Sequence, residues 1–239
     1  MTHKECGRDC SICPHAARQL YANMLRDNPD AFRKRRLGVV NLKAEETITR
    51  SSLPHPYLYV MYTGWSYTGI VLRDGRRQII DYFLPGDMLM SPGGLPIPEV
   101  ADWSYKALTD SSLCVLDAQL VFADIKSDPG LFMSYCGLLA ERLGRLVNLL
   151  TDIGCRRATG RIAQFIIYLE GRLHRIGLSQ NDAFDFPISQ DHLASTLGMT
   201  NVHVSRTMRE LRERGVIDFS KGSITILNRD VLHKIAEDH

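Results

Sequence analysis

The C-terminal segment from Pro187 to Ile226 constrains the fold of this 239-residue chain more than any other part of it. Ser189 stands before a short helical pattern, Gly198 follows that pattern, and Thr200 stands before a second helical pattern. Ser and Thr are favoured helix N-caps, and glycine permits the left-handed backbone of a tight turn. The apolar residues of the two patterns have the spacing of two helices that cross and pack: Leu193, Ala194, Leu197, Val204, Met208 and Leu211. The segment is therefore predicted to form a helix-turn-helix.

The residues after the second helix predict a β-hairpin. A short apolar run from Gly215 to Phe219 is followed by the polar turn Ser220 to Ser223 and by the run Ile224 to Ile226. Two such runs joined by a short turn that contains glycine are typical of a hairpin. A hairpin directly after a helix-turn-helix is the wing of a winged helix, so we expect a winged helix-turn-helix here.

The second helix of this motif has a polar outer face once its apolar positions are set aside. In a recognition helix Arg bonds guanine, Asn bonds adenine, apolar groups contact the thymine methyl, and Ser or Thr holds phosphate. Arg206 is the best candidate for reading a base, and Lys221 at the tip of the wing is placed for a backbone contact. The residues predicted to contact DNA are Ser189, Thr200, Asn201, Val202, His203, Ser205, Arg206, Arg209 and Lys221. A solvated face on which Glu210 and Glu213 pair the arginines is the alternative, and the capped turn with its wing favours DNA.

The net charge agrees with a local nucleic-acid surface. The chain has 29 basic and 27 acidic side chains and a formal charge of +2, which excludes a basic tail or a globally cationic coat. A dimer needs only two basic helices, spaced about one DNA turn apart, to bind a palindromic operator in double-stranded DNA. No apolar run approaches the roughly 20 residues of a membrane span, and the first residues lack a secretory hydrophobic region. We therefore expect a cytoplasmic protein without a membrane partner.

A long helix is predicted for residues 127–155. Asp128 is a favoured N-cap, and Pro129 suits the first helical position. Apolar residues then recur at alternating spacings of four and three, which are the a and d positions of a heptad repeat. The members of this row are Phe132, Cys136, Leu139, Leu143, Leu146, Leu150 and Ile153. The row predicts the dimerisation seam of a homodimeric coiled coil, and packing against the chain's own β domain is the alternative.

The middle of the chain, residues 37–126, is predicted to be an antiparallel β domain. Short runs rich in β-branched and aromatic residues alternate there with turn signals. Asp74 and Gly75 separate two such runs, and this pair favours the type I′ turn of a hairpin. Residues 1–36 form a separate N-terminal segment that contains cysteines, and residues 156–239 form the winged-helix DNA-binding domain.

The order of these parts resembles the Crp/Fnr transcription regulators over residues 39–236. The resemblance rests on Asp74 to Ile80 and Pro85 to Asp87 in the β domain and on Ser189 to Ala194 and Leu197 to Arg206 in the helix-turn-helix. It implies an α+β fold with an N-terminal cyclic-nucleotide-binding-like β jelly roll, a long dimerisation helix and a C-terminal winged helix-turn-helix. It also implies a homodimeric, sequence-specific transcription regulator with double-stranded DNA and RNA polymerase as partners. Val202 stands where the best-known members have glutamate, so we expect a different half-site.

The resemblance does not extend to cyclic-nucleotide binding. Nucleotide-responding members use a Gly-Glu segment for the ribose and an Arg-Ser or Arg-Thr pair for the cyclic phosphate. The corresponding stretch here, residues 91–108, contains no arginine, and Lys106 is expected to face solvent. We therefore expect no cyclic nucleotide as cofactor.

Three of the six cysteines lie close together near the N-terminus. Cys6, Cys10 and Cys13 have a spacing at which proteins commonly hold an iron-sulfur cluster. The oxygen-sensing fumarate and nitrate reduction branch of the family completes such a cluster with a distant cysteine of the roll, and Cys114 stands at the corresponding place. The resemblance thus implies these four cysteines as ligands of an oxygen- or redox-sensitive 4Fe-4S cluster. The spacing departs from that branch, in which the second gap is longer.

Other interpretations of the cysteines stay open. Zinc would suit a Cys3His set with His3 or His15 as the fourth ligand, and simple thiol switching needs no metal. A regulator of the same fold could also be gated by a small molecule or haem in the roll, beneath Trp103 and Tyr105, with His55 or His15 as a haem ligand. The cysteine spacing also occurs in radical S-adenosylmethionine enzymes, but these need a β/α barrel that the sequence lacks. No catalytic motif is present, and we expect no enzyme.

Overall fold

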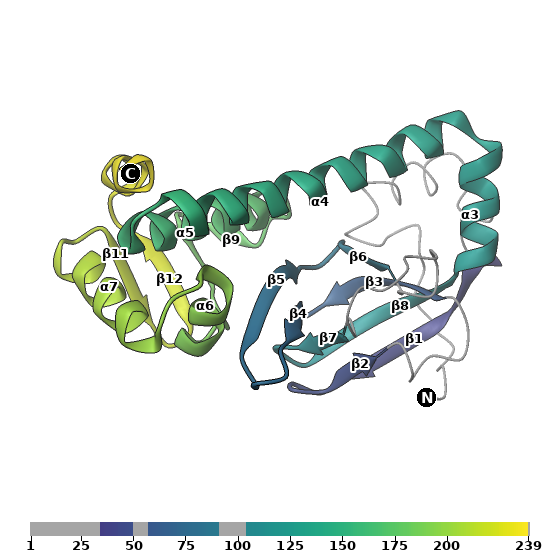
Figure 1. The fold of residues 1–239 in the computed structure, drawn as a ribbon. Helices are drawn as coiled ribbons and strands as arrows, with labels where there is room; N and C mark the ends of the chain where they lie inside the picture. Colours follow the sequence, from purple (N-terminus) through teal and green to yellow (C-terminus); the bar gives the residue numbers. More distant parts are fainter. Residues whose placement is uncertain (1–33, 50–56, 91–103, 239) are drawn as a thin grey trace. The chain divides into compact units, whose positions relative to one another are not determined.

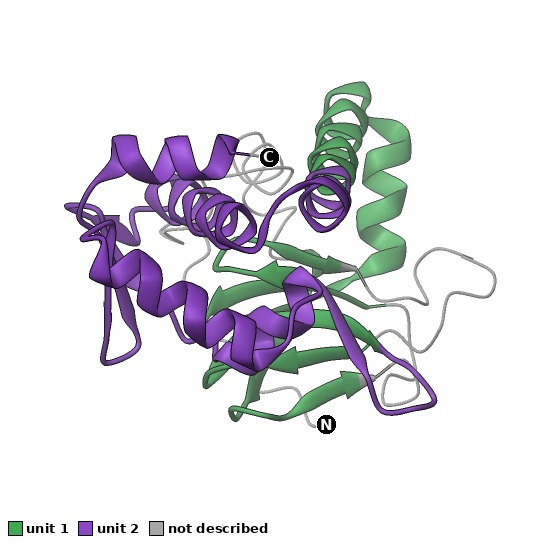
Figure 2. Ribbon diagram, turned by 60° about the vertical axis from the view of Figure 1, so that its left-hand side comes forward, with its two compact units in different colours: residues 1–70, 81–144 green, residues 71–80, 145–239 purple. Residues whose placement is uncertain are grey.

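The computed structural model describes residues 34–49, 57–90 and 104–238 (Figure 1). Its contacts divide the chain into two compact units, which Figure 2 colours separately. The first unit comprises residues 1–70 and 81–144, and the second comprises residues 71–80 and 145–239. The short segment 71–80 is the tip of a hairpin from the β domain, and its contacts assign it to the second unit.

Two four-stranded antiparallel sheets form the β domain. The first sheet has the order β1 (Arg36–Leu42), β8 (Ser111–Asp117), β3 (Tyr57–Thr63) and β6 (Met88–Met90). The second sheet has the order β2 (Thr47–Thr49), β7 (Ser104–Ala107), β4 (Ser66–Val71) and β5 (Arg77–Phe83). Strand neighbours that are distant in sequence, such as β1 and β8, are those of a jelly roll and not of a simple meander. The predicted α+β fold with an N-terminal jelly roll is confirmed.

Strand β8 shows how the first sheet is covered on both faces. Its side chains alternate, as the period of two of a strand requires. Leu113 and Val115 lie in an apolar cluster with Phe83 and Tyr105 of the second sheet. Cys114 and Leu116 point to the opposite face and lie in a different cluster, with residues of the two following helices.

Those two helices are α3 (Ala118–Ser127) and α4 (Pro129–Cys155). Asp117 caps α3 and accepts hydrogen bonds from the backbone N–H groups of Gln119 and Leu120. Asp128 caps α4, because its Oδ1 accepts from the N–H of Gly130 at 2.7 Å and of Leu131 at 3.2 Å. The predicted cap and length of α4 are confirmed, whereas α3 was not predicted within the β domain.

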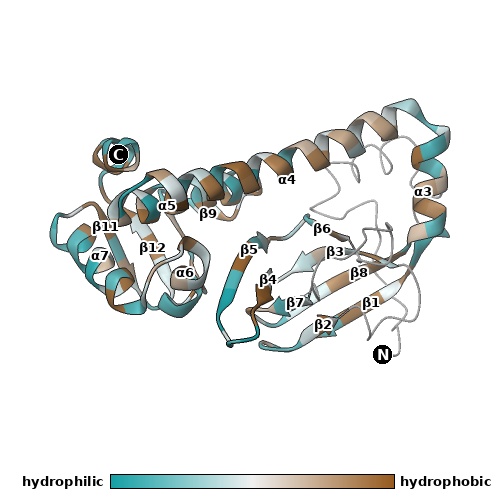
Figure 3. Cartoon of the chain, viewed as in Figure 1, coloured by the Kyte–Doolittle hydropathy of each residue, from teal (hydrophilic) through white to brown (hydrophobic). Residues whose placement is uncertain are grey.

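Helix α4 carries two heptad-spaced rows. Leu131, Tyr135 and Leu138 are buried in the cluster with α3 and the first sheet. The predicted seam follows this row by one residue, which turns it by about 100° around the helix. Its large members are exposed: Phe132, Leu139, Leu143, Leu146 and Leu150. Figure 3 shows apolar residues along much of α4. The row that packs against the β domain is therefore not the predicted seam, whose large members stay exposed among the described residues while Cys136 and Ile153 are half-buried. The role of the seam in dimerisation stays a prediction.

The second unit contains the winged helix. Its helices are α5 (Ala158–Arg175), α6 (Gln190–Leu197), α7 (Asn201–Glu213) and α8 (Arg229–Glu237). Its sheet has the order β11 (Ile217–Ser220), β12 (Ser223–Ile226), β10 (Ala183–Asp185) and β9 (Ser179–Gln180). The core side chains Leu169, Leu197, Val204, Leu211 and Leu232 are fully buried. The predicted winged helix-turn-helix is confirmed, and α8 with strands β9 and β10 was not predicted.

A buried carboxylate joins three elements of this unit. Glu170 of α5 accepts a hydrogen bond from Ser179 of β9 at 3.1 Å and pairs with Arg229 of α8 at 3.3 Å. The winged helix is therefore held by a polar link as well as by its apolar core. None of the helices in the described ranges has the length and apolar content that crossing a membrane requires.

Candidate nucleic-acid interface

The turn of the helix-turn-helix is fixed by local capping. The Ser189 Oγ accepts from the N–H of His192 at 3.2 Å, and the Ser189 N–H donates to Nδ1 of His192 at 3.3 Å. Gly198 ends α6 in the left-handed conformation, with φ +62°. Thr200 then caps α7 and accepts from the N–H of His203 at 3.3 Å. The three capping and turn roles predicted from the sequence are confirmed, and they fix where α7 begins.

Helix α7 separates into a buried and an exposed side. Val204, Thr207, Met208 and Leu211 are buried in the unit. The opposite side forms a shallow groove of about 720 Å³. The groove is lined by Asn201, Val202, Ser205, Arg206, Arg209, Glu210 and Glu213. Five of the predicted contact residues therefore share one surface, and Val202 presents an apolar group there because its side chain is 67% exposed.

The arginines of α7 differ in what they contact. Arg212 pairs with Asp218 at 3.6 Å, and Arg214 pairs with Glu210 at 3.3 Å. Arg206 and Arg209 have no hydrogen bond or ion pair with any other described residue. Their guanidinium groups are exposed and available to base edges or phosphates.

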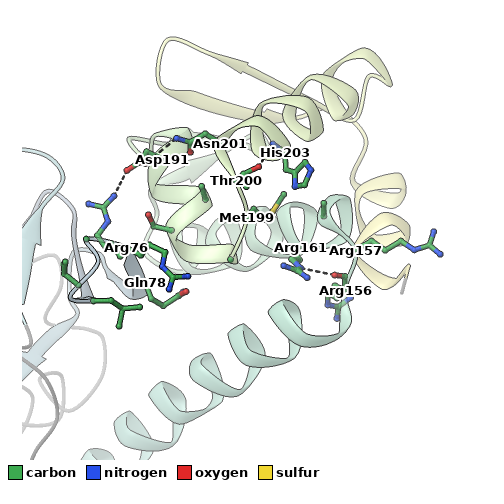
Figure 4. A pocket seen from close by; sticks show the side chains of 18 residues that line it. Arg76, Gln78, Arg156, Arg157, Arg161, Asp191, Met199, Thr200, Asn201 and His203 are labelled. Atoms are coloured by element: carbon green, nitrogen blue, oxygen red, sulfur yellow. Dashed lines mark hydrogen bonds and ion pairs between the residues drawn. The ribbon is translucent and has the colours of Figure 1, made fainter.

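A second cavity, of about 960 Å³, lies beside the N-terminus of α7 (Figure 4). Thr200, Asn201 and His203 line one side of it. The other lining residues come from residues 156–157 before α5, from α5, from α6 and the turn after it, and from the hairpin 71–80 of the same unit. Arginines are frequent among them: Arg76, Arg77, Arg156, Arg157 and Arg161. Their position beside α7 was not predictable from the sequence, because they come from two segments far apart in the chain.

Arg161 fixes the wall of this cavity. Its Nη1 donates to the carbonyl oxygen of Leu197 at 3.0 Å, and its Nε donates to the carbonyl oxygen of Arg156 at 2.9 Å. Arg156 also pairs with Asp152 at 2.7 Å. Burial raises the pKa of Asp152, because it disfavours the charged form more than Arg156 and Arg161 favour it.

The two remaining predicted DNA contacts lie apart from both cavities. Ser189 is exposed at the start of α6. Lys221 is exposed in the turn between β11 and β12 and has a left-handed backbone, with φ +50°. This turn is the tip of the wing, as predicted. A DNA contact by either side chain remains a prediction.

The predicted cluster ligands are only partly within the described ranges. Cys6, Cys10 and Cys13 lie outside the described residues, as do His3, His15, His55 and Trp103. Cys114 lies on β8, 9% exposed, in the apolar cluster with Leu131, Tyr135 and Leu138 of α4. The described ranges contain no group of three or more His, Cys, Asp or Glu side chains arranged to hold a metal ion.

Comparison with known proteins shows which proteins share this architecture. Residues 160–235 match the model of the Crp-like helix-turn-helix domain. The nitrogen fixation regulation protein FixK of Azorhizobium caulinodans is 28% identical over 74% of this chain and 71% of its own length. The solved structure of FixK2 from Bradyrhizobium japonicum superposes with a TM-score of 0.73 at 25% identity, and the match covers 84% of this chain and 96% of that one. The domain match, the relatives and the structural neighbour together support a Crp/Fnr family regulator.

Other Crp/Fnr relatives agree with this assignment. The transcriptional activator protein FnrL of Cereibacter sphaeroides is 23% identical over 73% of this chain and 70% of its own length. The chain is thus a DNA-binding transcription regulator of the Crp/Fnr type, and the homologues are regulators, which are in general not enzymes.

Proposed function

We propose that this Crp/Fnr protein acts as a cytoplasmic homodimer that reads a two-fold symmetric operator, one α7 helix in each half-site. The observation that carries the proposal is the groove on α7. It combines Arg206 and Arg209, which have no hydrogen bond or ion pair with another described residue, with the amide of Asn201 and the exposed side chain of Val202. These are the side chains that read guanine, phosphate, adenine and the thymine methyl.

The exposed seam of α4 supports the dimer. Leu143 is 62% exposed and Leu150 is 73% exposed, although both belong to a continuous apolar row. Burial of a leucine contributes about 1.5 to 3 kcal/mol, so the same row on a second copy provides a favourable cover. Two α7 helices related by the dimer axis would then meet two half-sites, centred about 10 base pairs apart or at a multiple of that distance. RNA polymerase is the further partner that we propose for such a regulator.

The test is selection of bound duplexes from a random-sequence DNA pool by the full-length protein, followed by sequencing. We expect an enriched two-fold symmetric motif, which we call the selected operator. Selection with the Arg206→Ala variant should lose the preference at one base pair of each half-site, whereas Arg212→Ala, whose guanidinium pairs with Asp218, should retain the full motif. An asymmetric motif, or no enrichment with the wild-type protein, would refute the proposed reading.

A second proposal concerns the signal. Cys6, Cys10, Cys13 and Cys114 would hold a 4Fe-4S cluster, because thiolates are the usual protein ligands of such clusters. When bound, the cluster would supply an oxygen- or redox-sensitive link between the N-terminal segment and the roll. The specific support is the position of Cys114. Its side chain shares an apolar cluster with Tyr135 and Leu138 of α4, so ligation or loss of ligation at this thiol would act on the helix that carries the seam.

Anaerobic purification with visible spectroscopy and metal analysis tests this second proposal. We expect an iron-bearing, coloured protein that loses its absorbance in the Cys114→Ala variant. Cys136→Ala is the matched control, because Cys136 belongs to the seam of α4 and is not a proposed ligand. A colourless protein that contains zinc would favour the Cys3His site. A Cys114→Ala variant with an unchanged spectrum would exclude this ligand set, and a small molecule or haem recovered from the roll would favour the alternative sensor.

A further inference from the structure

The hairpin tip 71–80 contacts the helix-turn-helix within the second unit. Its turn is closed by a hydrogen bond from the N–H of Leu72 to the carbonyl oxygen of Arg76 at 2.7 Å, and Gly75 supplies a positive φ of +83°. Arg76 pairs with Asp74 at 2.7 Å, so its charge is compensated inside the hairpin. The next two residues, Arg77 and Gln78, are the ones that contact α6.

These two side chains hold α6 near both of its ends. Arg77 Nη2 pairs with Asp191 Oδ2 at 2.6 Å, in the first turn of α6. Gln78 Nε2 donates to the carbonyl oxygen of Thr196 at 2.9 Å, in the last turn. The Arg77 side chain is only 22% exposed, whereas that of Asp191 is 65% exposed. Arg77 is thus the more buried partner of the pair, and through it the hairpin tip fixes the position of the Asp191 carboxylate.

Asp191 passes this contact on to the recognition helix. Its second oxygen, Oδ1, accepts from Nδ2 of Asn201 at 3.5 Å, the outer limit of a hydrogen bond. Asn201 is the first residue of α7 and is predicted to contact a base. Figure 4 shows Asp191 between the hairpin and Asn201. The chain Arg77, Asp191, Asn201 thus joins the hairpin tip 71–80 to the N-terminal end of α7 within the second unit, the end that would enter the major groove under the proposed function.

The charge of Asp191 makes this contact important. It is the one carboxylate among the residues that line the cavity beside α7. A negative charge at this position repels DNA phosphates unless a cation compensates it. Arg77 supplies that cation at hydrogen-bond distance. With Arg77 in place, Asp191 orients the Asn201 amide at little electrostatic cost.

We infer that Arg77 is a positioning residue for DNA reading, which acts through Asp191 on Asn201. The inference rests on the proposed function and adds to it a contributor from the hairpin tip 71–80 of the same unit. Arg77 does not touch the base in this arrangement. It compensates the carboxylate that holds the reading amide.

The experiment is a double-mutant cycle on the full-length protein, with fluorescence anisotropy on the selected operator. Arg77→Ala is expected to weaken binding about five- to tenfold and to reduce discrimination at the base pair whose identity Asn201→Ala also ceases to read. In the Asp191→Asn background the same change should cost less than about twofold, because no charge is left to compensate. Arg77→Lys should retain most of the affinity, since it keeps the cation.

Arg76→Ala is the matched control, because this neighbouring arginine pairs inside the hairpin. It should leave discrimination at the Asn201 base pair unchanged, and melting curves of all variants check that they are folded. Three outcomes would overturn the inference: no effect of Arg77→Ala, an equal loss in both backgrounds, which would mean that Arg77 contacts DNA itself, or tighter binding, which would mean that the hairpin restrains α7. A wild-type protein that selects no operator would instead refute the proposed function.

Discussion

Helices α4 and α7 both present to solvent a row of side chains that the described chain leaves uncovered, but the chemistry of the two rows is opposite. The row on α4 is apolar and includes Leu143 and Leu150. The row on α7 is polar and cationic, with Arg206 and Arg209. Exposure of the apolar row on α4 to water is unfavourable, whereas water solvates the cationic row on α7. Helix α4 therefore needs a partner that removes its apolar row from water, whereas α7 is stable in water and is suited to bind a polyanion.

The largest expected effect concerns the apolar seam of α4. The double variant Leu143→Glu with Leu150→Glu places charges on the seam of both copies, so four buried leucines are lost from the dimer. At about 1.5 kcal/mol or more for each leucine, the dimer loses about 6 kcal/mol, or about 10⁴ in its dissociation constant. Size-exclusion chromatography with light scattering should show a monomer at micromolar concentration.

Asn148→Glu is the control for this variant. Asn148 is exposed on the side of α4 opposite the seam, so this variant adds one glutamate charge to each copy without touching the row. It should remain dimeric. A double variant that elutes as a dimer would show that the seam is not the dimer contact.

A smaller effect is expected for the arginines of α7. Arg209→Ala removes one phosphate contact from each half-site and should lower operator affinity by about 1 kcal/mol. It should make the dependence of log affinity on log salt shallower by about 1.8, because each phosphate contact contributes about 0.9. Arg212→Ala removes an arginine that is already paired with Asp218 and should change the slope less. Anisotropy titrations between 50 and 200 mM salt, conditions chosen to span about two decades of affinity, measure both slopes. Equal slopes for the two variants would remove the distinction between paired and available arginines.

The smallest expected effect concerns Val202. Its side chain is 67% exposed, so Val202→Ala should leave the melting temperature unchanged. It should weaken binding by less than about 1 kcal/mol and only at one base pair, where the thymine methyl is lost as a contact. Substitution of that thymine by uracil in the operator should produce the same loss in the wild-type protein and none in the variant. An effect spread over all base pairs would point to a structural role.

The winged helix was predictable because its signals are local. Ser189, Gly198 and Thr200 act within a few residues of themselves, as caps and as a turn, and the structure shows those hydrogen bonds. The row on α4 was predictable for the same reason, since a heptad spacing is a property of one helix. Whether this row or its neighbour is buried was not predictable, because the spacing alone does not tell which face of α4 the rest of the chain covers.

The parts that escaped prediction depend on contacts between distant residues. Arg77 and Asp191 are 114 positions apart, and neither has a neighbouring motif that indicates the pair. Strands β9 and β10 have two and three residues, too few for a recognisable alternation. Helix α3 follows β8 directly and is stabilised by the cluster of Val121 and Ile125 with the first sheet, a tertiary effect that overrides a weak local pattern.

The most direct test of sequence reading by α7 is the affinity of the Arg206→Ala variant for the selected operator and for a scrambled duplex of the same length and composition. The contact of one arginine with guanine is expected to account for about 1 to 3 kcal/mol of discrimination. The homodimeric variant loses one such contact in each half-site, so it should lose about 2 to 6 kcal/mol on the operator and much less on the scrambled duplex. An equal loss on both duplexes, or no loss on the operator, would contradict base reading through Arg206.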